Sequence, residues 1–326
     1  MEARYNRYRS RTVTEKMKGN SKKKHNKEYT AHFIPNISNV SNGHRREHCS
    51  ANGNRIKKIG IGQGQQVRIV RTLTKGNSFA LYTVSDVHDQ EPNTVFVGYT
   101  EPKDLLARLE LVDTNPFRGK VNTQVVATGL TEAEAETYGE FVERLIDDGY
   151  NSKLIVIAPH GGYIEKHTDT QAERVCEQLP ERYVSAWICK GFKQGGGAYD
   201  RWHITSTDIN EESFPKLKSV IGRRFEYSIA FHGWDEDSIC IGGSIPQDLK
   251  QKIKEAIVNA VSGQISVETD YEKTCPGAFN GDDEKNIVNR LSTKGLQIEQ
   301  SRKARTRYGI QIADAVADIL VPMIKV

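Results

Sequence analysis

The chain has 326 residues, enough for one large domain or two modest ones with a sizeable core. Lys and Arg total 46 against 42 for Asp and Glu, but residues 1–50 alone hold 12 basic and 4 acidic side chains, so the net charge of +4 comes from the N-terminal segment. No apolar run approaches the roughly 20 residues that span a bilayer, and Met1 leads into polar residues instead of an apolar signal core. We therefore expect a chain made in the cytoplasm, neither membrane-embedded nor exported by the Sec route.

The first segment, residues 1–52, is rich in Arg, Lys, Asn and Ser and has almost no clustered apolar residues. Such a composition buries too little surface to offset the entropy lost on ordering, so we predict a disordered basic tail. Its SKKKHNK run at 21–27 could make non-specific contact with nucleic acid or another anionic polymer, although a solvated tail is the simpler interpretation. We expect no other nucleic-acid partner and no membrane partner.

Residues 53–120 differ from the first segment in their pattern of apolar residues. Apolar residues alternate over 67–71 and run together over 79–84, which is typical of strands, so we predict a small β-rich region. Gly60, Gly62 and Gly64 form a Gly-x-Gly-x-Gly run, but no glycine follows three residues later and no clear helix begins there. This run is therefore predicted to be a turn-rich segment, not a dinucleotide site.

Residues 121–326 alternate between helical and strand patterns. Apolar residues at helical spacing over 131–148, before Gly149, predict an amphipathic helix, and the apolar run at 153–159 is typical of a strand buried on both faces. The pattern as a whole predicts an α/β domain with a mixed, largely parallel sheet flanked by helices. We expect further helices at 169–179, 211–222, 246–261 and 304–320, and strands at 184–188, 203–206, 227–231, 239–241, 265–267 and 296–299.

The five cysteines lie far apart and form no Cys-x-x-Cys pair. An odd number at these spacings argues against a disulfide framework and against a thiolate zinc knuckle. We therefore expect reduced thiols, with Cys189 and Cys240 buried in apolar strands.

Ligand-type side chains follow three of the predicted strands. His160 and Glu165 lie on the glycine-rich loop after 153–159, His232 follows 227–231, and Glu299 ends 296–299. Ligands of open α/β sheets bind at the carboxyl ends of strands. Two histidines and a carboxylate, with a second carboxylate nearby, match the needs of catalytic zinc: three ligands, an open position for water and a base.

Simpler interpretations exist for each residue taken alone. His160 could be satisfied by backbone groups of its loop, and His232 could be a half-buried core histidine. His88 and Glu91 show the shorter His-x2-Glu spacing of some zinc peptidases and follow another predicted strand, so they form a rival pair. The joint placement favours the first site, because three separate strand ends each deliver a ligand-type residue.

Four motifs, in this order, resemble those of the phage-type poly-γ-glutamate hydrolases, whose fold is similar to that of zinc carboxypeptidases. They are APHGGYIE at 158–165, WHITST at 202–207, FHG at 231–233 and GLQIEQSR at 295–302. The resemblance runs from about residue 120 to the C-terminus, and it implies a zinc carboxypeptidase-like domain over 121–326.

The resemblance also implies roles for individual residues. His160, Glu165 and His232 would hold one Zn²⁺, and Glu299 would be the general base. The chain departs from the family pattern at Lys166-His167-Thr168, where a glycine usually precedes the threonine, and at Ile209-Asn210-Glu211, in place of the more usual Phe-Asp-Glu. The first departure places His167 near the metal, as a substitute ligand or a further substrate contact.

The substrate implied by the resemblance is poly-γ-glutamate or a similar anionic amide polymer. Each of its residues bears a free α-carboxylate, which calls for cationic contacts. Arg302 and Arg305, just past Glu299, and Arg201, beside the second motif, are the candidates. His203 of that motif either lines the cleft or caps the next helix. Without a signal core, the enzyme would reach an extracellular polymer only through cell lysis or a non-Sec route.

The sequence thus predicts a zinc-dependent hydrolase of γ-glutamyl amide bonds. One alternative is a zinc deacylase that cleaves a small N-acyl amino acid with the same ligands in a closed pocket. A second is a non-catalytic module that binds an anionic polymer. A pure binder needs neither a complete ligand set nor a base, so the four site residues favour an enzyme.

Overall fold

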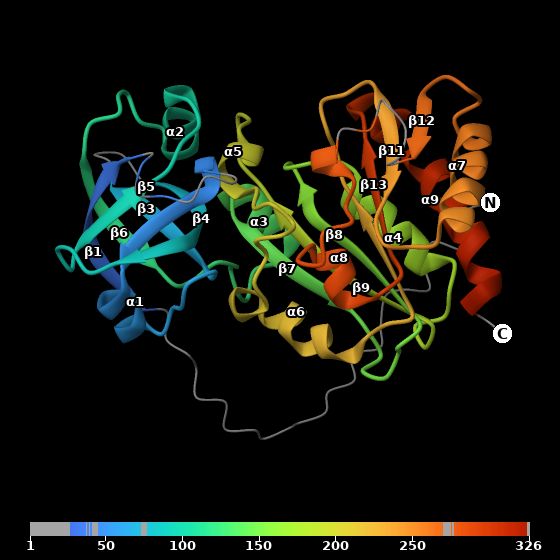
Figure 1. Ribbon diagram of the computed structural model, residues 1–326, viewed down its shortest axis with the longest axis horizontal. Helices are drawn as coiled ribbons and strands as arrows, with labels where there is room; N and C mark the ends of the chain where they lie inside the picture. Colours follow the sequence, from blue (N-terminus) through green and yellow to red (C-terminus); the bar gives the residue numbers. More distant parts are fainter. Residues whose placement is uncertain are drawn as a thin grey trace.

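The computed structural model describes residues 27–36, 38, 40, 45–72, 77–269, 275 and 277–324. Two lobes stand side by side: a β-barrel formed by the N-terminal part, drawn in blue and teal, and an α/β domain formed by the rest (Figure 1). No helix in the described part of the chain is both long and apolar enough to cross a membrane.

The N-terminal lobe is a closed barrel of six strands in the order β1-β5-β2-β4-β3-β6. Its core contains Phe33, Ile69, Tyr82 and Leu105, all buried. The strands are β1 Glu28–Pro35, β2 His48–Asn52, β3 Gln66–Thr72, β4 Asn77–His88, β5 Thr94–Val97 and β6 Phe117–Asn122, and the helices are η1 Arg45–Glu47, α1 Gly53–Ile59 and α2 Pro102–Leu109.

The prediction of a disordered tail over 1–52 is wrong for its second half, since β1 and β2 are strands of the barrel. Buried Tyr29, Ala31 and Phe33 alternate with exposed polar residues along β1. The alternation covers too few residues to stand out in a polar, basic segment, and the barrel supplies its burial. Residues 1–26, including most of the SKKKHNK run, lie outside the described part.

The second lobe is built on a seven-stranded sheet of order β12-β11-β13-β10-β8-β9-β7. Only β11 against β13 and β7 against β9 are antiparallel, which confirms the predicted mixed, largely parallel sheet. The strands are β7 Phe141–Ile146, β8 Leu154–Gly162, β9 Val184–Gly191, β10 Tyr227–Phe231, β11 Ser238–Gly242, β12 Ser266–Thr269 and β13 Gly295–Gln300.

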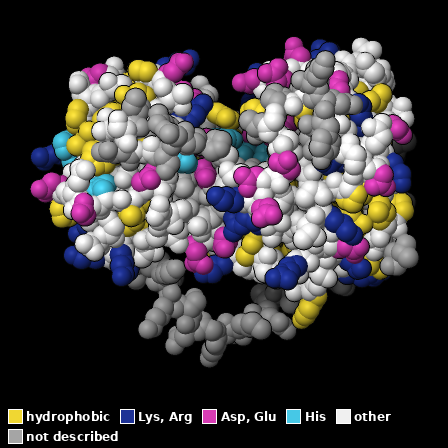
Figure 2. Space-filling view, viewed as in Figure 1, with side chains coloured by type: hydrophobic (Ala, Val, Ile, Leu, Met, Phe, Trp, Pro, Cys, Tyr) yellow, Lys and Arg dark blue, Asp and Glu magenta, His cyan; other side chains and the backbone are white. Residues whose placement is uncertain are grey.

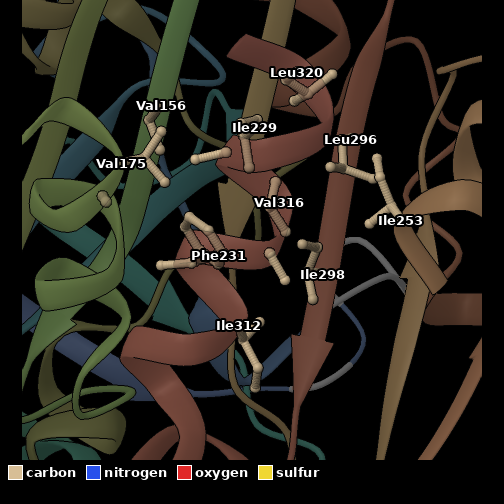
Figure 3. Close-up of a cluster of buried hydrophobic side chains, with 14 of the residues drawn as sticks. Val156, Val175, Ile229, Phe231, Ile253, Leu296, Ile298, Ile312, Val316 and Leu320 are labelled. Atoms are coloured by element: carbon tan, nitrogen blue, oxygen red, sulfur yellow. The ribbon is translucent and has the colours of Figure 1, made fainter. Parts of the chain in front are cut away.

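Helices cover both faces of this sheet. On one face α4 Thr168–Glu177, α7 Gln247–Ala260 and α9 Arg302–Ile324 enclose an aliphatic core, in which Ile229 and Phe231 of β10 meet Ile312 and Val316 of α9 (Figure 3). Shorter helices pack on the other face. They are α5 Ala198–Trp202, α6 Pro215–Val220 and α8 Ile287–Leu291. The remaining elements of this lobe are the helix α3 Glu132–Tyr138 and the 3-10 turns η2 Glu211–Ser213, η3 Ile221–Arg223 and η4 Gly277–Phe279.

The predicted helix over 131–148 is wrong in its second half. A capping box between Thr131 and Glu134 begins α3, but Gly139 adopts a left-handed conformation (φ 66°) and ends the helix after seven residues. The chain continues as β7, which pairs with β9 at the sheet edge. Apolar residues at 141, 142, 145 and 146 suit either structure, and pairing with β9 decides for the strand.

Two further local predictions are corrected. Residues 203–206, predicted as a strand, form a loop after α5. The helix predicted over 211–222 is broken, because Phe214 precedes Pro215 and takes an extended conformation (φ −124°, ψ 92°). The other predicted helices and strands of this lobe are present with shifted ends.

The expectation of reduced thiols is also corrected, because Cys240 of β11 and Cys275 form a disulfide. They are 35 residues apart in the sequence, so local spacing gives no sign of this pairing. Cys49, Cys176 and Cys189 are free.

The barrel and the α/β domain share an extensive interface. Leu81 of β4 is fully buried in the apolar cluster of the second lobe, with Trp202 and Phe141. Arg68 of β3 donates to Glu140 at 2.9 Å, and Gln66 contacts the backbone of Asp208 at 2.6 Å. The two lobes are therefore packed together by apolar and polar contacts.

Candidate active site

The predicted site residues come together at one edge of the sheet. His160 lies near the end of β8, His232 directly follows β10 and Glu299 lies near the end of β13. These three strands are parallel neighbours in the order β13-β10-β8, so their carboxyl ends meet. Histidine side chains are visible in the hollow between the two lobes (Figure 2).

Two glycines let Glu165 return to His160. Gly161 approaches the β9 backbone so closely that a Cβ would meet the Cys189 carbonyl oxygen at 2.7 Å, and Gly162 has a φ of 69°. The turn after them closes with the Glu165 N–H donating to the His160 carbonyl at 2.8 Å. A compact loop thus places the Glu165 carboxylate beside Nδ1 of the His160 imidazole.

The inward-facing atoms are well placed to bind a metal. His160 Nδ1 lies 3.2 Å from His232 Nδ1. Glu165 contacts both rings, with Oε1 3.0 Å from His160 Nδ1 and Oε2 3.4 Å from His232 Nδ1. Two nitrogens bound tetrahedrally to Zn²⁺ at about 2.0–2.1 Å lie roughly 3.3–3.4 Å apart, so this donor set fits the ion.

The outer ring nitrogens have partners of their own on the loop that follows α5. His160 Nε2 lies 2.9 Å from the Ile204 carbonyl oxygen, and this contact requires Nε2 to carry the hydrogen. His232 Nε2 lies 3.3 Å from Ser206 Oγ. In His160, Nδ1 is therefore left as the lone-pair donor, the arrangement seen when histidines bind metals.

Charge and burial act against each other in this cluster. Burial acts to raise the pKa of Glu165, but the adjacent His160 and His232 outweigh it and hold the pKa well below its usual value. Burial acts to lower the pKa of His160, and Glu165 outweighs it and raises that pKa. The carboxylate is therefore ionised between the two imidazoles.

His203 is a third imidazole at the same place. Its Nε2 lies 3.7 Å from Glu165 Oε1, and its ring stacks on Tyr199 with centroids 4.4 Å apart. One ligand atom each of His160, Glu165 and His203 lie within 4.8 Å of one another, so these three residues could also hold a metal ion. Burial, the largest influence, lowers the pKa of His203, which favours a neutral ring.

Glu299 is a buried carboxylate beside this cluster. Gln297 Nε2 donates to its Oε1 at 3.0 Å. Burial raises the pKa of Glu299 to about 7, although His232 acts in the opposite direction. The group therefore exchanges its proton near neutral pH, as a general base must.

A family model described as poly-γ-glutamate hydrolase matches residues 130–311, more than half of the chain. This chain belongs to the poly-γ-glutamate hydrolase family. The match covers the α/β domain with the clustered side chains and leaves out the barrel. It confirms the resemblance predicted from the four motifs.

Solved structures similar to this hydrolase include a bacteriophage poly-γ-glutamate hydrolase, at 22% identity over 56% of this chain and 89% of that chain, with a TM-score of 0.44. Zinc-free YndL matches at 21% identity over 59% of this chain and 96% of that chain, with a TM-score of 0.44. No curated protein shows a significant match.

The cationic residues predicted for substrate occupy different places in this family member. Arg305 is buried beside Gly233, and its Nη1 donates to the Lys166 carbonyl at 2.9 Å. His167, which is exposed, lines one hollow together with buried Arg305 and exposed Arg307. His167 therefore lies with the arginines and not with the clustered His160, Glu165 and His203. Arg302 is exposed at the first turn of α9.

Arg201 serves the domain interface of the hydrolase. Its guanidinium donates to Glu110, just past α2 of the barrel lobe, at 2.8 Å and lies over the Phe79 ring, 4.5 Å from the centroid. We therefore leave it out of the substrate-binding residues. His88 of the rival pair lies against the Phe96 ring. Among the described residues, the side chains of His160, Glu165 and His203 are grouped closely enough to hold a metal, and His88 is not one of them.

Glu47 is the site residue that sequence reasoning missed. It lies in η1, inside the segment predicted to be disordered, and is 1% exposed. Its Oε1 lies 2.5 Å from His203 Nδ1. The polar, basic composition of residues 1–50 gives no local signal for a buried carboxylate at this position.

Proposed function

We propose that this protein hydrolyses γ-glutamyl amide bonds of poly-γ-glutamate in a zinc-dependent reaction. The observation that carries the proposal is the pair of facing Nδ1 atoms, 3.2 Å apart, with the Glu165 carboxylate beside both and Glu299 nearby. Family membership supports the choice of substrate.

His160, Glu165 and His232 would hold the ion, as predicted. Adding His203 would make four protein ligands, which is typical of structural zinc, whereas catalytic sites keep one position open. We assign the third position to His232, because its Nδ1 lies 3.2 Å from His160 Nδ1 and 3.4 Å from Glu165 Oε2. His203, whose Nε2 lies 3.7 Å from Glu165 Oε1, is then left on the substrate side. When bound at these residues, Zn²⁺ would supply a water with a pKa of about 7 and would polarise the scissile carbonyl.

Glu299 accepts the proton of the attacking water at its carboxylate and passes it to the leaving amine. Its pKa of about 7 makes both transfers feasible near neutral pH. The hydrogen bond from Gln297 holds Oε1 in place at 3.0 Å, which orients the carboxylate for this task.

The substrate carries one free α-carboxylate per residue, and the hollow lined by His167, Arg305 and Arg307 offers positive charge to such groups. Arg305 is held by two backbone carbonyls, those of Gln300 at 3.2 Å and Lys166 at 2.9 Å. A preorganised guanidinium loses little entropy on binding. Arg302, exposed at the start of the same helix, would offer a second cationic contact.

The first experiment measures zinc content and poly-γ-glutamate cleavage on the same samples of wild type, His160→Ala and His232→Ala. We expect one zinc per chain in wild type, and loss of metal and of cleavage in both variants. His88→Ala is the matched control, because it removes the histidine of the rival pair, and it should keep both properties.

The other outcomes separate the alternatives. Zinc binding without polymer cleavage would shift the proposal to a deacylase of small N-acyl amino acids. Polymer binding by a wild type that holds no zinc after reconstitution would favour a non-catalytic module. Loss of zinc in His88→Ala alone would move the site to the rival pair.

A further inference from the structure

A carboxylate from the barrel reaches into the active site of the other lobe. Glu47 lies in η1, before β2, and its side chain is 1% exposed. It contacts the loop after α5, where its Oε1 lies 2.5 Å from His203 Nδ1. Its Oε2 accepts from the Thr205 backbone N–H at 2.7 Å and from Thr205 Oγ1 at 3.1 Å.

The loop 203–206 also contacts His160 and His232, the two histidines whose Nδ1 atoms face each other. The Ile204 carbonyl accepts from His160 Nε2 at 2.9 Å, and Ser206 Oγ lies 3.3 Å from His232 Nε2. Glu47 binds the residues on either side of Ile204. A continuous set of hydrogen bonds therefore runs from the barrel, through the loop 203–206, to both rings.

Arg108 of α2 supports this contact from the barrel side. It is 1% exposed, its Nη1 lies 4.0 Å from Glu47 Oε1, and its Nη2 lies 3.4 Å from the His203 carbonyl oxygen. A buried carboxylate is costly unless charges and hydrogen bonds compensate it. Arg108, His203 and Thr205 together satisfy Glu47, so its position is well defined.

We propose that Glu47 is a positioning residue of the hydrolase site and that the barrel completes the catalytic centre instead of serving as a separate module. Glu47 fixes the Nδ1–H tautomer of His203 and the position of the loop 203–206. That loop in turn orients His160 and His232. The expected effect on zinc affinity rests on the proposed function. The effect of Glu47 on the His203 tautomer and on the loop does not depend on a metal.

The test uses the full chain with Glu47→Ala and Glu47→Gln. Glu140→Gln is the matched control, because it also removes an interface carboxylate, the partner of Arg68 at 2.9 Å, but the contacts of Glu140 do not include the 203–206 loop. Glu47→Gln preserves side-chain size and keeps an acceptor for Thr205, so it covers the case in which Glu47→Ala does not fold.

Two readouts are measured. Long-range ¹H–¹⁵N spectra of the imidazoles in metal-free protein should show His203 protonated at Nδ1 in wild type and in Glu140→Gln. In the Glu47 variants we expect the Nε2–H form to gain population. Chelator competition should show a 10–100-fold loss of zinc affinity in Glu47→Ala, the range for loss of groups that orient metal ligands, and less than a twofold change in Glu140→Gln.

Folded Glu47 variants with wild-type imidazole spectra and wild-type zinc affinity would overturn the inference. An equal loss of zinc affinity in Glu140→Gln would also overturn it, since a general weakening of the interface would then explain the effect. A wild type that binds no zinc would refute the proposed function, whereas the imidazole spectra would still decide whether Glu47 positions His203.

Discussion

Glu299 shows how burial prepares one residue for its chemistry. It is 6% exposed at the end of a central strand, and this burial raises its pKa to about 7. The nearby Glu165 has the opposite shift because two imidazoles contact it directly. Two carboxylates in one site are thereby set for different tasks, one to bind a cation and the other to exchange a proton.

The Glu299→Gln variant should retain one zinc per chain and lose about 10²–10⁴-fold in kcat, the usual contribution of a general base. A base must be unprotonated to act, so the wild-type rate should fall as pH drops through a midpoint at or below about 7, since a bound cation moves this midpoint downward. The measurements are metal analysis and a pH–rate profile. An unchanged acidic limb in Glu299→Gln would contradict the assignment.

The roles of His203 and His160 can be separated by the same pair of assays. His203→Ala should bind zinc with no more than a modest loss of affinity, while cleavage of poly-γ-glutamate falls strongly. His160→Ala should lose the metal itself, because it removes one of the facing nitrogens. Complete loss of zinc in His203→Ala would instead place His203 among the ligands.

At the scale of elements, the site depends on how β8 ends. The strand continues past Ala158 with a register irregularity against β9, and Gly162 then takes a φ of 69° before the chain turns to Glu165. A side chain at this position would be strained and would also meet the Gly191 carbonyl oxygen at 2.9 Å. The two-glycine loop is thus a geometric requirement of the site.

Gly162→Ala should lower the free energy of unfolding by about 1–3 kcal/mol, the cost of an unfavourable backbone conformation, and reduce zinc affinity by displacing Glu165. Gly222→Ala is the control, since a Cβ there meets open space and should change stability by less than about 0.5 kcal/mol. Chemical denaturation and chelator competition measure both effects. Equal stability of the two variants would show that the loop tolerates a side chain.

At the scale of the whole molecule, the barrel and the α/β domain are joined by a shared apolar cluster as well as by charges. Leu81 of the barrel strand β4 is fully buried, and the apolar cluster around it consists mainly of residues of the other lobe. Glu47 and Arg108 extend this contact to the site. The molecule is therefore expected to unfold as one cooperative unit.

Leu81→Ala should destabilise the protein by about 2–5 kcal/mol, as expected for a buried leucine. All three tryptophans, at 187, 202 and 234, lie in the α/β domain, so their fluorescence reports on that lobe. We expect fluorescence and far-UV circular dichroism to give coincident transitions that shift together in the variant. A fluorescence transition unaffected by Leu81→Ala would show that the lobes unfold independently.

The sequence by itself determined the α/β class, most elements of the second lobe, and the expectation that His160, His232 and Glu299 share one edge of the sheet. These follow from local periodicity and from the rule that parallel strands deliver their ends to one edge. Glu165 also follows, because its glycine-rich loop is a local feature.

Tertiary structure decided what local pattern left open. Residues 141–146 became a strand because β9 was available to pair. Residues 28–35 and 48–52 became strands because barrel closure buries every second side chain of the first segment and all five residues of the second. Glu47 reached His203 across 156 residues of sequence. Such a contact leaves no periodic trace, since its energy comes from partners brought together only when the two lobes pack.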